Sequence, residues 1–218
     1  MKIFDNTTIK AIDRATIEID GVTSLELVER AAEAIACEII SRWRANKKVS
    51  IFAGPGNNGA DALAVARLLS QKGYHVEVFL FNTKGQLSEE CQTNLNRLKT
   101  CGSVYFTEIS TQFDPPILTE QHLIIDGLFG NGLNKPLNGG FASVVKYINA
   151  SKSPVVAIDI PSGLMGEDNT YNIRQNIIHA DVTLSIQLPK LSFLFPENES
   201  IVGEWELLDI SLKQTYID

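Results

Sequence analysis

The hydrophobic residues of this chain form two kinds of pattern that alternate along the sequence. Continuous apolar runs predict buried β-strands at residues 49–53, 76–81, 104–107, 123–126, 155–160, 182–188 and 204–209. Between several of these runs, apolar positions recur at helical spacing and predict helices at residues 60–71, 88–100 and 140–150. Strands buried on both faces that alternate with helices are typical of a parallel sheet in an α/β domain. Such sheets bind ligands at the carboxyl ends of their strands.

Two amphipathic helices are predicted before the first strand. The first covers residues 7–20, and the second begins after the capping pair Thr23-Ser24 and runs toward Trp43. The residues that share one face of the first helix are Ile9, Ile12, Ala15, Thr16 and Ile19. Such helices either pack on the sheet or present a surface to a partner, and we expect most of their length to pack on the sheet. A Pro-Pro pair within residues 114–116 interrupts the loop before the fourth strand, where we expect the chain to cross to the other half of the sheet.

Composition narrows the classes of protein to which the chain can belong. Its 218 residues, of which 44% are hydrophobic and 21% charged, fit one soluble domain with a sizeable core. A net charge of -7 argues against a broad surface for nucleic acid or for an anionic membrane. No apolar run reaches the length of a membrane span, and the first residues lack a signal-peptide pattern. Cys37, Cys91 and Cys101 show no C-x-x-C spacing, so we expect reduced structural thiols in a cytoplasmic protein.

A glycine-rich loop follows the first strand. Gly54, Gly56 and Gly59 match G-x-G-x-x-G, the fingerprint of dinucleotide sites. Three features nevertheless argue against a pyrophosphate at this loop. Its intervening positions include two amides, Asn57 and Asn58; Asp61 places a carboxylate in the predicted first helical turn; and the next strand ends without an acid to bind a ribose. The loop therefore predicts a site that orients its ligand with amide and carboxylate side chains.

Two further strands end in acidic, glycine-containing loops. Asp126 ends the fourth strand and precedes Gly130, Gly132 and Lys135, the last being a candidate phosphate contact. Taken singly, Asp126 is better explained as a cap for the backbone of its own turn. Asp159 ends the next strand, beside a proline that stiffens the turn. Because parallel strands deliver their carboxyl ends to one edge, we expect Asp61, Asp126 and Asp159 to surround a single cavity.

Asp159 is the strongest candidate for acid–base chemistry. A carboxylate delivered by a buried strand is partly desolvated, which would raise its pKa toward the range useful to a general acid or base. Lys190 follows a later strand and is interpreted equally well as a neighbour of the same edge or as a solvated lysine. Ser162 lies outside any G-x-S-x-G elbow, which argues against a serine hydrolase.

Five motifs in chain order carry a resemblance to a known family. They occupy residues 54–62, 126–137, 156–164, 180–190 and 203–210 and answer the patterns G-x-G-N-N-G-G-D-G, D-A-L-F-G-T-G-L-x-R-P-L, V-A-V-D-I-P-S-G-L, A-D-x-T-x-x-F…P-K and G-x-x-x-x-x-D-I. With these motifs and the two leading helices, the whole chain resembles the NAD(P)H-hydrate epimerases, the YjeF N-terminal domain family. The resemblance implies a Rossmann-like three-layer α/β/α sandwich with a mostly parallel central sheet and two extra N-terminal helices, in one domain covering residues 1–218.

The chain departs from the family pattern at a few positions. Ala60 and Ala62 stand where the family has glycines, and Asn131 and Lys135 replace its threonine and arginine. A methyl group at the first two positions would clash if φ were positive or the ligand very close. Lys135 keeps the charge but loses the planar fork of arginine.

The resemblance implies an isomerase that interconverts the R and S epimers of NADH or NADPH hydrated at C6 of the nicotinamide ring, with Asp159 as general acid and base. The implied substrate-binding residues are Asn57, Asn58, Gly59, Ala60, Asp61, Gly130, Asn131, Gly132, Leu133, Asn134, Lys135, Pro136 and Asp159. One potassium ion (K+) per subunit is also implied, held by Asn58, Asp126 and Ser162. Amide, carboxylate and hydroxyl oxygens are hard ligands that suit such an ion.

The implied partners are the hydrated nucleotide, an ATP- or ADP-dependent dehydratase that is separate or fused at the carboxyl end, and a second copy in a homodimer that uses the N-terminal helices. Three alternatives remain. An NAD(P)-binding oxidoreductase is weakened by the missing ribose acid and by Asp61. A non-catalytic scaffold predicts degraded acids and a basic surface, and neither is present. A sensor would bind the nucleotide without turnover.

Overall fold

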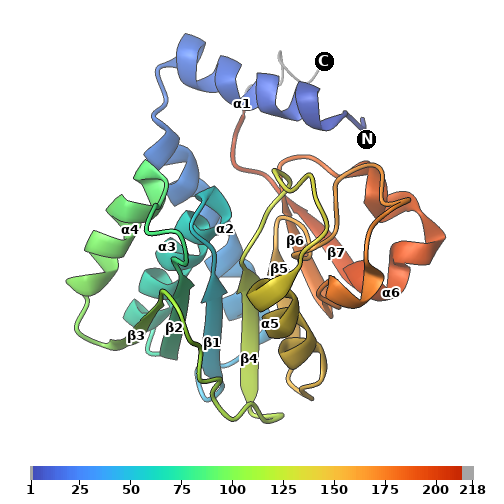
Figure 1. Cartoon of the computed structure of the whole chain (residues 1–218). Coiled ribbons are helices and arrows are strands. Elements are labelled where there is room, and N and C mark those ends of the chain that lie inside the picture. The colour runs from blue at the N-terminus through green and yellow to red at the C-terminus, as the bar shows by residue number, and fades with distance from the viewer. Residues whose placement is uncertain (1, 213–218) are drawn as a thin grey trace.

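A computed structural model describes residues 2–212 of the chain, apart from the side chains of Asp13 and Asp20 (Figure 1). Seven strands form one sheet in the order β3-β2-β1-β4-β5-β6-β7. They are β1 (Lys48–Ala53), β2 (His75–Phe81), β3 (Val104–Ile109), β4 (His122–Gly127), β5 (Val155–Ile158), β6 (Val182–Ile186) and β7 (Glu204–Leu208). All neighbouring pairs among these strands are parallel, so the predicted parallel sheet is confirmed.

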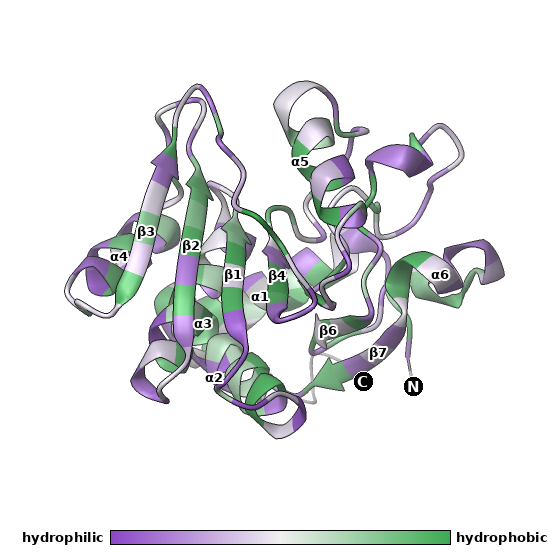
Figure 2. Cartoon of the chain, turned by 90° about the horizontal axis from the view of Figure 1, so that it is seen from below, coloured by the Kyte–Doolittle hydropathy of each residue, from purple (hydrophilic) through white to green (hydrophobic). Residues whose placement is uncertain are grey.

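Helices cover both faces of the sheet and complete the three predicted layers (Figure 2). One face carries α2 (Ser24–Arg42), α3 (Asn57–Gln71) and α4 (Glu89–Lys99), and the other carries α5 (Gly139–Asn149). Strand side chains alternate between the two layers: Ile125 packs in the core with α2, α3 and α4, and Ile124 in the core with α5. The remaining short helices are η1 (Arg174–Asn176), η2 (Leu191–Leu194), η3 (Pro196–Asn198) and α6 (Glu199–Val202).

The chain crosses the sheet between β3 and β4. β3 lies at one edge, whereas β4 pairs with β1 in the middle. The connecting segment carries Phe113, whose ring packs edge-on against Phe52, Phe79 and Phe81. The crossing predicted at residues 114–116 is therefore confirmed, and it makes the carboxyl ends of β1 and β4 the place where such a sheet binds its ligand.

The first helix, α1 (Asn6–Asp20), does not pack on a face of the sheet. It lies across the carboxyl edge, above the strands (Figure 1). Ile12 is buried with Leu188, Ile210 and Leu212 in a small cluster of its own, whereas Ile19 is 67% exposed. The expected packing on the sheet is thus confirmed for α2 and wrong for α1, which forms a roof. No helix within residues 2–212 has the length and apolar character needed to cross a membrane.

The helix after β1 begins earlier than the sequence predicts. α3 starts at Asn57, three residues before the expected residue 60, with Gly56 as its N-cap. Ala60 N donates to Gly56 O at 3.0 Å, which closes the first turn. Asp61 therefore lies in the second turn, and its predicted place in the first turn is wrong. The free N–H groups in the first turn of α3 therefore have no carboxylate side chain within the same turn.

The three cysteines differ in exposure. Cys37 is exposed, Cys101 is partly buried, and the thiol of buried Cys91 donates to Gly54 O at 3.7 Å. Burial, aided by the charges of Asp61, Glu108 and Glu90, raises the pKa of Cys91 from 9.0 to about 12. The stabilising contribution of this raised pKa is present below pH 9 and is lost as the pH rises toward 12.

We expect a thiol-reactive disulfide reagent at pH 8 to modify Cys37 in the folded protein and Cys91 only after unfolding, because the buried thiol is protonated and inaccessible. Peptide mass spectrometry after timed labelling, with and without denaturant, measures both rates. Modification of Cys91 in the native protein as fast as that of Cys37 would contradict the burial described above.

Candidate active site

A cavity of about 700 Å³ lies at the carboxyl edge of the sheet, where the segments that follow β1, β4, β5 and β6 meet beneath α1. Its volume is in the range of small-molecule and cofactor sites. The lining residues from the strand ends are Pro55, Gly56, Asn57, Asn58, Asp61, residues 128–134, Asp159, residues 186–188 and Lys190. Further lining residues come from α1 (Ile9, Lys10 and Ile17), from α2 (Ser24, Leu27, Val28 and Ala31) and from the segment after β7 (Ile210 and Leu212).

The three acids expected around one cavity occupy two different depths. Asp61 and Asp159 both line the cavity, although they are 98 residues apart in sequence. Asp126 is 0% exposed and lies outside the lining. The prediction that three carboxylates surround one cavity is therefore confirmed for Asp61 and Asp159 and wrong for Asp126, which instead supports the loops that form the wall.

Asp126 joins the loop after β4 to the loop after β5. Its Oδ1 accepts hydrogen bonds from Ser162 Oγ at 2.6 Å and from Leu128 N at 3.2 Å, and its Oδ2 accepts one from Ser162 N at 2.7 Å. Ser162 Oγ in turn accepts from Phe129 N at 2.9 Å. Burial raises the pKa of Asp126 to about 6, against the lowering effect of these hydrogen bonds. Asp126 thus caps its own turn, as the structural alternative predicts, and also holds Ser162.

The first turn of α3 presents two amide side chains to the cavity. Asn57 and Asn58 line it, whereas Gly59 and Ala60 are buried behind them and do not. Asn58 is 9% exposed, and its Nδ2 has no hydrogen-bond partner among the described residues. A buried donor without a partner is rare in folded proteins, and this one belongs to a residue that lines the cavity.

The loop after β4 lines the cavity with residues that carry no charge. Residues 130–134, which are Gly130, Asn131, Gly132, Leu133 and Asn134, all line the cavity. Lys135 is exposed and Pro136 is partly buried, and neither lies in the lining. The candidate phosphate contact at Lys135 is therefore placed outside this cavity, while Lys10 of α1 lies within its lining.

The glycines of the first motif bring the loops into direct contact. A Cβ at Gly54 would lie 1.8 Å from Leu128 O, and one at Gly59 would lie 1.8 Å from Gly54 O. Across the same contact, a Cβ at Gly127 would lie 2.4 Å from the Cβ of Ala62. These positions require glycine because the β1 loop packs closely against the β4 loop and against the start of α3, a role that the G-x-G-x-x-G spacing alone does not reveal.

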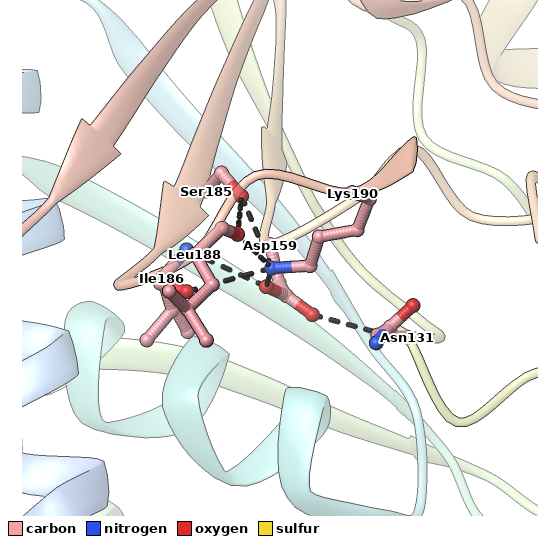
Figure 3. Close-up of polar contacts among 6 residues, drawn as sticks. All are labelled: Asn131, Asp159, Ser185, Ile186, Leu188 and Lys190. Atoms are coloured by element: carbon pink, nitrogen blue, oxygen red, sulfur yellow. Dashed lines mark hydrogen bonds and ion pairs between the residues drawn. The ribbon is translucent and has the colours of Figure 1, made fainter. Parts of the chain in front are cut away.

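Asp159 forms an ion pair that the sequence left undecided (Figure 3). Its φ of 67° turns the chain out of β5 and toward the cavity, where Oδ2 accepts from Asn131 N at 3.2 Å. Its Oδ1 pairs with the ammonium of Lys190, whose side chain is only 2% exposed. The solvated alternative for Lys190 is therefore wrong. Asp159 is partly desolvated, as the sequence predicts, with its side chain 14% exposed, and Lys190 is a charged partner that the sequence did not assign to it.

The chain matches the family model described as YjeF-related protein N-terminus over residues 24–192. It belongs to this family. A protein named NAD(P)H-hydrate epimerase from Limosilactobacillus fermentum is 34% identical over 195 residues, covering 89% of this chain and 90% of the relative. The bifunctional NAD(P)H-hydrate repair enzyme Nnr of Thermofilum pendens is 33% identical across 100% of this chain, which spans 42% of that protein.

The crystal structure of yeast ynu0 shares the fold of this YjeF-related chain. The two superpose with a TM-score of 0.77 at 23% sequence identity, covering 95% of this chain and 87% of the yeast chain. The family match begins at the start of α2, so that α1, which roofs the cavity, lies outside the matched residues.

The alanines that replace family glycines fit their positions in the YjeF-related fold. Ala60 and Ala62 are both 0% exposed within α3, and neither appears among the described residues with positive φ. Ala60 does not line the cavity, so its methyl group does not meet a ligand there. The clash considered from the sequence therefore does not arise.

Sequence reasoning missed the contributions of the helices to the site. Nothing in the spacing of α1 or α2 marks Lys10 or Leu27 as cavity residues, because an amphipathic pattern shows which face is buried but not what covers it. Ser185 and Leu188, which contact Lys190, also escaped notice. The sequence signal for these contacts was the Pro189-Lys190 pair directly after a predicted strand, which places a lysine near the carboxyl edge of the sheet.

Proposed function

We propose that this protein is an NAD(P)H-hydrate epimerase, which interconverts the R and S epimers of NADH or NADPH hydrated at C6 of the nicotinamide ring. The names of its relatives support this activity. The observation that carries the proposal is the position of Asp159, a carboxylate on the wall of the cavity at the carboxyl edge of the sheet, held by hydrogen bonds and an ion pair.

The chemistry requires one group to move a proton in both directions. The C6 hydroxyl lies beside the ring nitrogen, so its departure leaves an iminium ion to which water adds on the opposite face. Protonated Asp159 gives a proton to the departing hydroxyl, which leaves as water. The resulting carboxylate then takes a proton from the incoming water, so that the cycle ends with no net proton consumed.

Other residues of the cavity orient the substrate. In this proposal Asn57, Asn58 and Asp61 hold the ring, since their amide and carboxylate groups face the cavity from α3. The loop 130–136 takes the phosphates through its backbone, with residues 130–134 at the cavity and Lys135 and Pro136 at its margin. Gly59 and Ala60 act behind them by setting the start of α3.

A potassium ion fits the residues beneath the cavity. The donor set Asn58, Asp126 and Ser162 offers amide, carboxylate and hydroxyl oxygens with a single negative charge. Asp126 is completely buried and forms no ion pair with any described residue, and a built Cβ at Gly130 would lie 3.2 Å from Asn58 Oδ1. When bound, the ion would offset the cost of burying the Asp126 charge and tie the three loops together.

The cellular context completes the proposal. An ATP- or ADP-dependent dehydratase consumes the S epimer, either as a separate protein or as a fused domain, and the bifunctional name of the Thermofilum relative supports this coupling. We also propose a cytoplasmic location, because that is where the nucleotide pool resides, and a homodimer.

The proposed function predicts a specific outcome with mixed substrate epimers. An S-specific dehydratase alone should leave the R epimer of hydrated NADH behind, and added protein should lead to its complete consumption. Separation of the epimers by chromatography measures this directly. An oxidoreductase would instead transfer hydride with unmodified cofactor, and a protein that only binds would leave the R epimer in place; either result contradicts the proposal.

A further inference from the structure

We propose that Lys190 is a positioning residue for this reaction: its buried ammonium holds Oδ1 of Asp159, which fixes the carboxyl group in one orientation and leaves Oδ2 for the proton transfers. The inference rests on the proposed epimerase function, which gives Asp159 its role and leaves Lys190 without one. The pair joins the segments that follow β5 and β6.

The ammonium of Lys190 is buried within a set of oxygens that offsets the loss of water. Its Nζ donates to Asp159 Oδ1, to Ser185 Oγ at 3.0 Å, to Leu188 O at 3.0 Å and, more weakly, to Ile186 O at 3.4 Å (Figure 3). Among these partners Asp159 alone carries a charge. A buried ammonium is strongly unfavourable without such a partner, so the pair is maintained as a unit.

The backbone that carries the neutral oxygens is itself held in place. Gln187 has a φ of 56°, in the left-handed region. Pro189, directly before Lys190, has its own φ fixed by its ring. The side chain of Gln187 accepts a hydrogen bond from Ile210 N at 2.9 Å, and Ser185 Oγ donates to Leu188 O at 3.0 Å. The ammonium is therefore fixed relative to β6, and Asp159 is aligned on it.

This arrangement gives the two oxygens of Asp159 different tasks. Oδ1 is occupied by Lys190, with Ile186 N also nearby at 3.4 Å. Oδ2 accepts from Asn131 N, which belongs to the loop that lines the cavity. Oδ2 is consequently the oxygen directed toward the substrate side, and Lys190 fixes that assignment by holding the other one.

The surrounding charges leave Lys190 as the dominant influence on Asp159. Among the residues that the structure describes, the other charged side chains of the cavity lining are Asp61 on α3 and Lys10 on α1. Lys190 alone among them makes a direct ion pair with Asp159. Because electrostatic interactions weaken with distance, the direct contact with Lys190 constrains the orientation of Asp159 more than these other charges do.

The test compares Lys190→Met and Lys190→Gln with the wild type in the coupled epimerase assay, with kcat and KM measured separately. Both variants are expected to lower kcat by about 10- to 100-fold and to change KM little, because the carboxyl group remains but loses its fixed orientation. Lys190→Arg, which keeps the charge and a donor for Asp159, should retain more of the wild-type kcat than either variant. Lys152→Met is the matched control, since Lys152 is exposed and remote from the cavity lining.

The outcomes separate this inference from the proposed function. A wild-type kcat for folded Lys190→Met, or a loss that appears in KM while kcat is unchanged, shows that Lys190 does not position Asp159. The Gln variant, whose amide can still donate to Ser185 and Leu188, carries the same prediction if the Met variant does not fold. Failure of the wild-type protein to consume the R epimer would instead remove the proposed function itself.

Discussion

Replacing Asp159 with asparagine is expected to lower the rate of R-to-S epimerisation by about 10²- to 10⁴-fold, the usual contribution of a general acid or base. An amide neither protonates the departing hydroxyl nor accepts a proton from water. Asparagine is suited to this position because it tolerates the left-handed φ of 67°. The rate is measured with purified R epimer and an excess of S-specific dehydratase.

The control for this variant is Lys152→Met, which changes an exposed side chain away from the cavity and should retain wild-type activity. Thermal unfolding of each variant establishes that it is folded under assay conditions. Wild-type turnover by folded Asp159→Asn would show that Asp159 is not the acid–base group. Asp61, the other acid that lines the cavity, would then be the candidate.

Replacing Asp159 with alanine is expected to lower the free energy of unfolding by about 3–5 kcal/mol, because it leaves the ammonium of Lys190 buried without a charged partner. An alanine at positive φ adds about 1 kcal/mol to that loss. Combining Asp159→Ala with Lys190→Met removes both charges, so the double variant should be more stable than Asp159→Ala alone. Urea unfolding at pH 7 of the wild type, both single variants and the double variant gives the coupling energy.

That coupling energy decides whether Asp159 and Lys190 stabilise the fold as one unit or independently of each other. A double variant less stable than Asp159→Ala, by the full effect of Lys190→Met, would mean that the two side chains contribute independently. That result would contradict the account of the pair as one unit, while leaving the catalytic role of Asp159 to be judged by the kinetic measurement.

The sheet and the acidic loops could be predicted from local patterns. Continuous apolar runs indicate strands buried on both faces, and parallel pairing then places every strand-end loop at one edge. This reasoning predicts that Asp61 and Asp159 share one cavity, and the structure confirms it. It also placed the crossing of the chain near residues 114–116, because a Pro-Pro pair cannot continue a strand.

The depth of Asp126 and the start of α3 depend on contacts that local patterns do not encode. Asp126 lies beneath the cavity, where it is hydrogen-bonded to Ser162, 36 residues later in the chain. Asn57, Asn58 and Gly59 are poor helix formers, yet they open α3 because Gly59 packs against Gly54. Tertiary packing overrides propensity here, and it moves Asp61 into the second turn.

The position of α1 above the cavity and the ion pair between Asp159 and Lys190 could not be predicted from the sequence either. The periodicity of α1 shows that it buries Ile12 and Thr16, but a helix buried at a sheet edge has the same pattern as one buried on a sheet face. The burial of Lys190 depends on a turn with a left-handed Gln187, which brings the lysine back to Asp159 across 31 residues. Lysine is rarely buried in proteins, so the residue type alone favours a solvated side chain at this position.

The most direct test of the central claim uses substrate from which a dehydratase has already removed the S epimer. The remaining R epimer of hydrated NADH is incubated with the same dehydratase and with either the wild-type protein or folded Asp159→Asn. We predict that the wild type leads to its complete disappearance and that the variant leaves nearly all of it over the same period. An R epimer that persists with the wild type, or that disappears equally fast with both, would contradict a cavity built around the carboxylate of Asp159 for epimerisation.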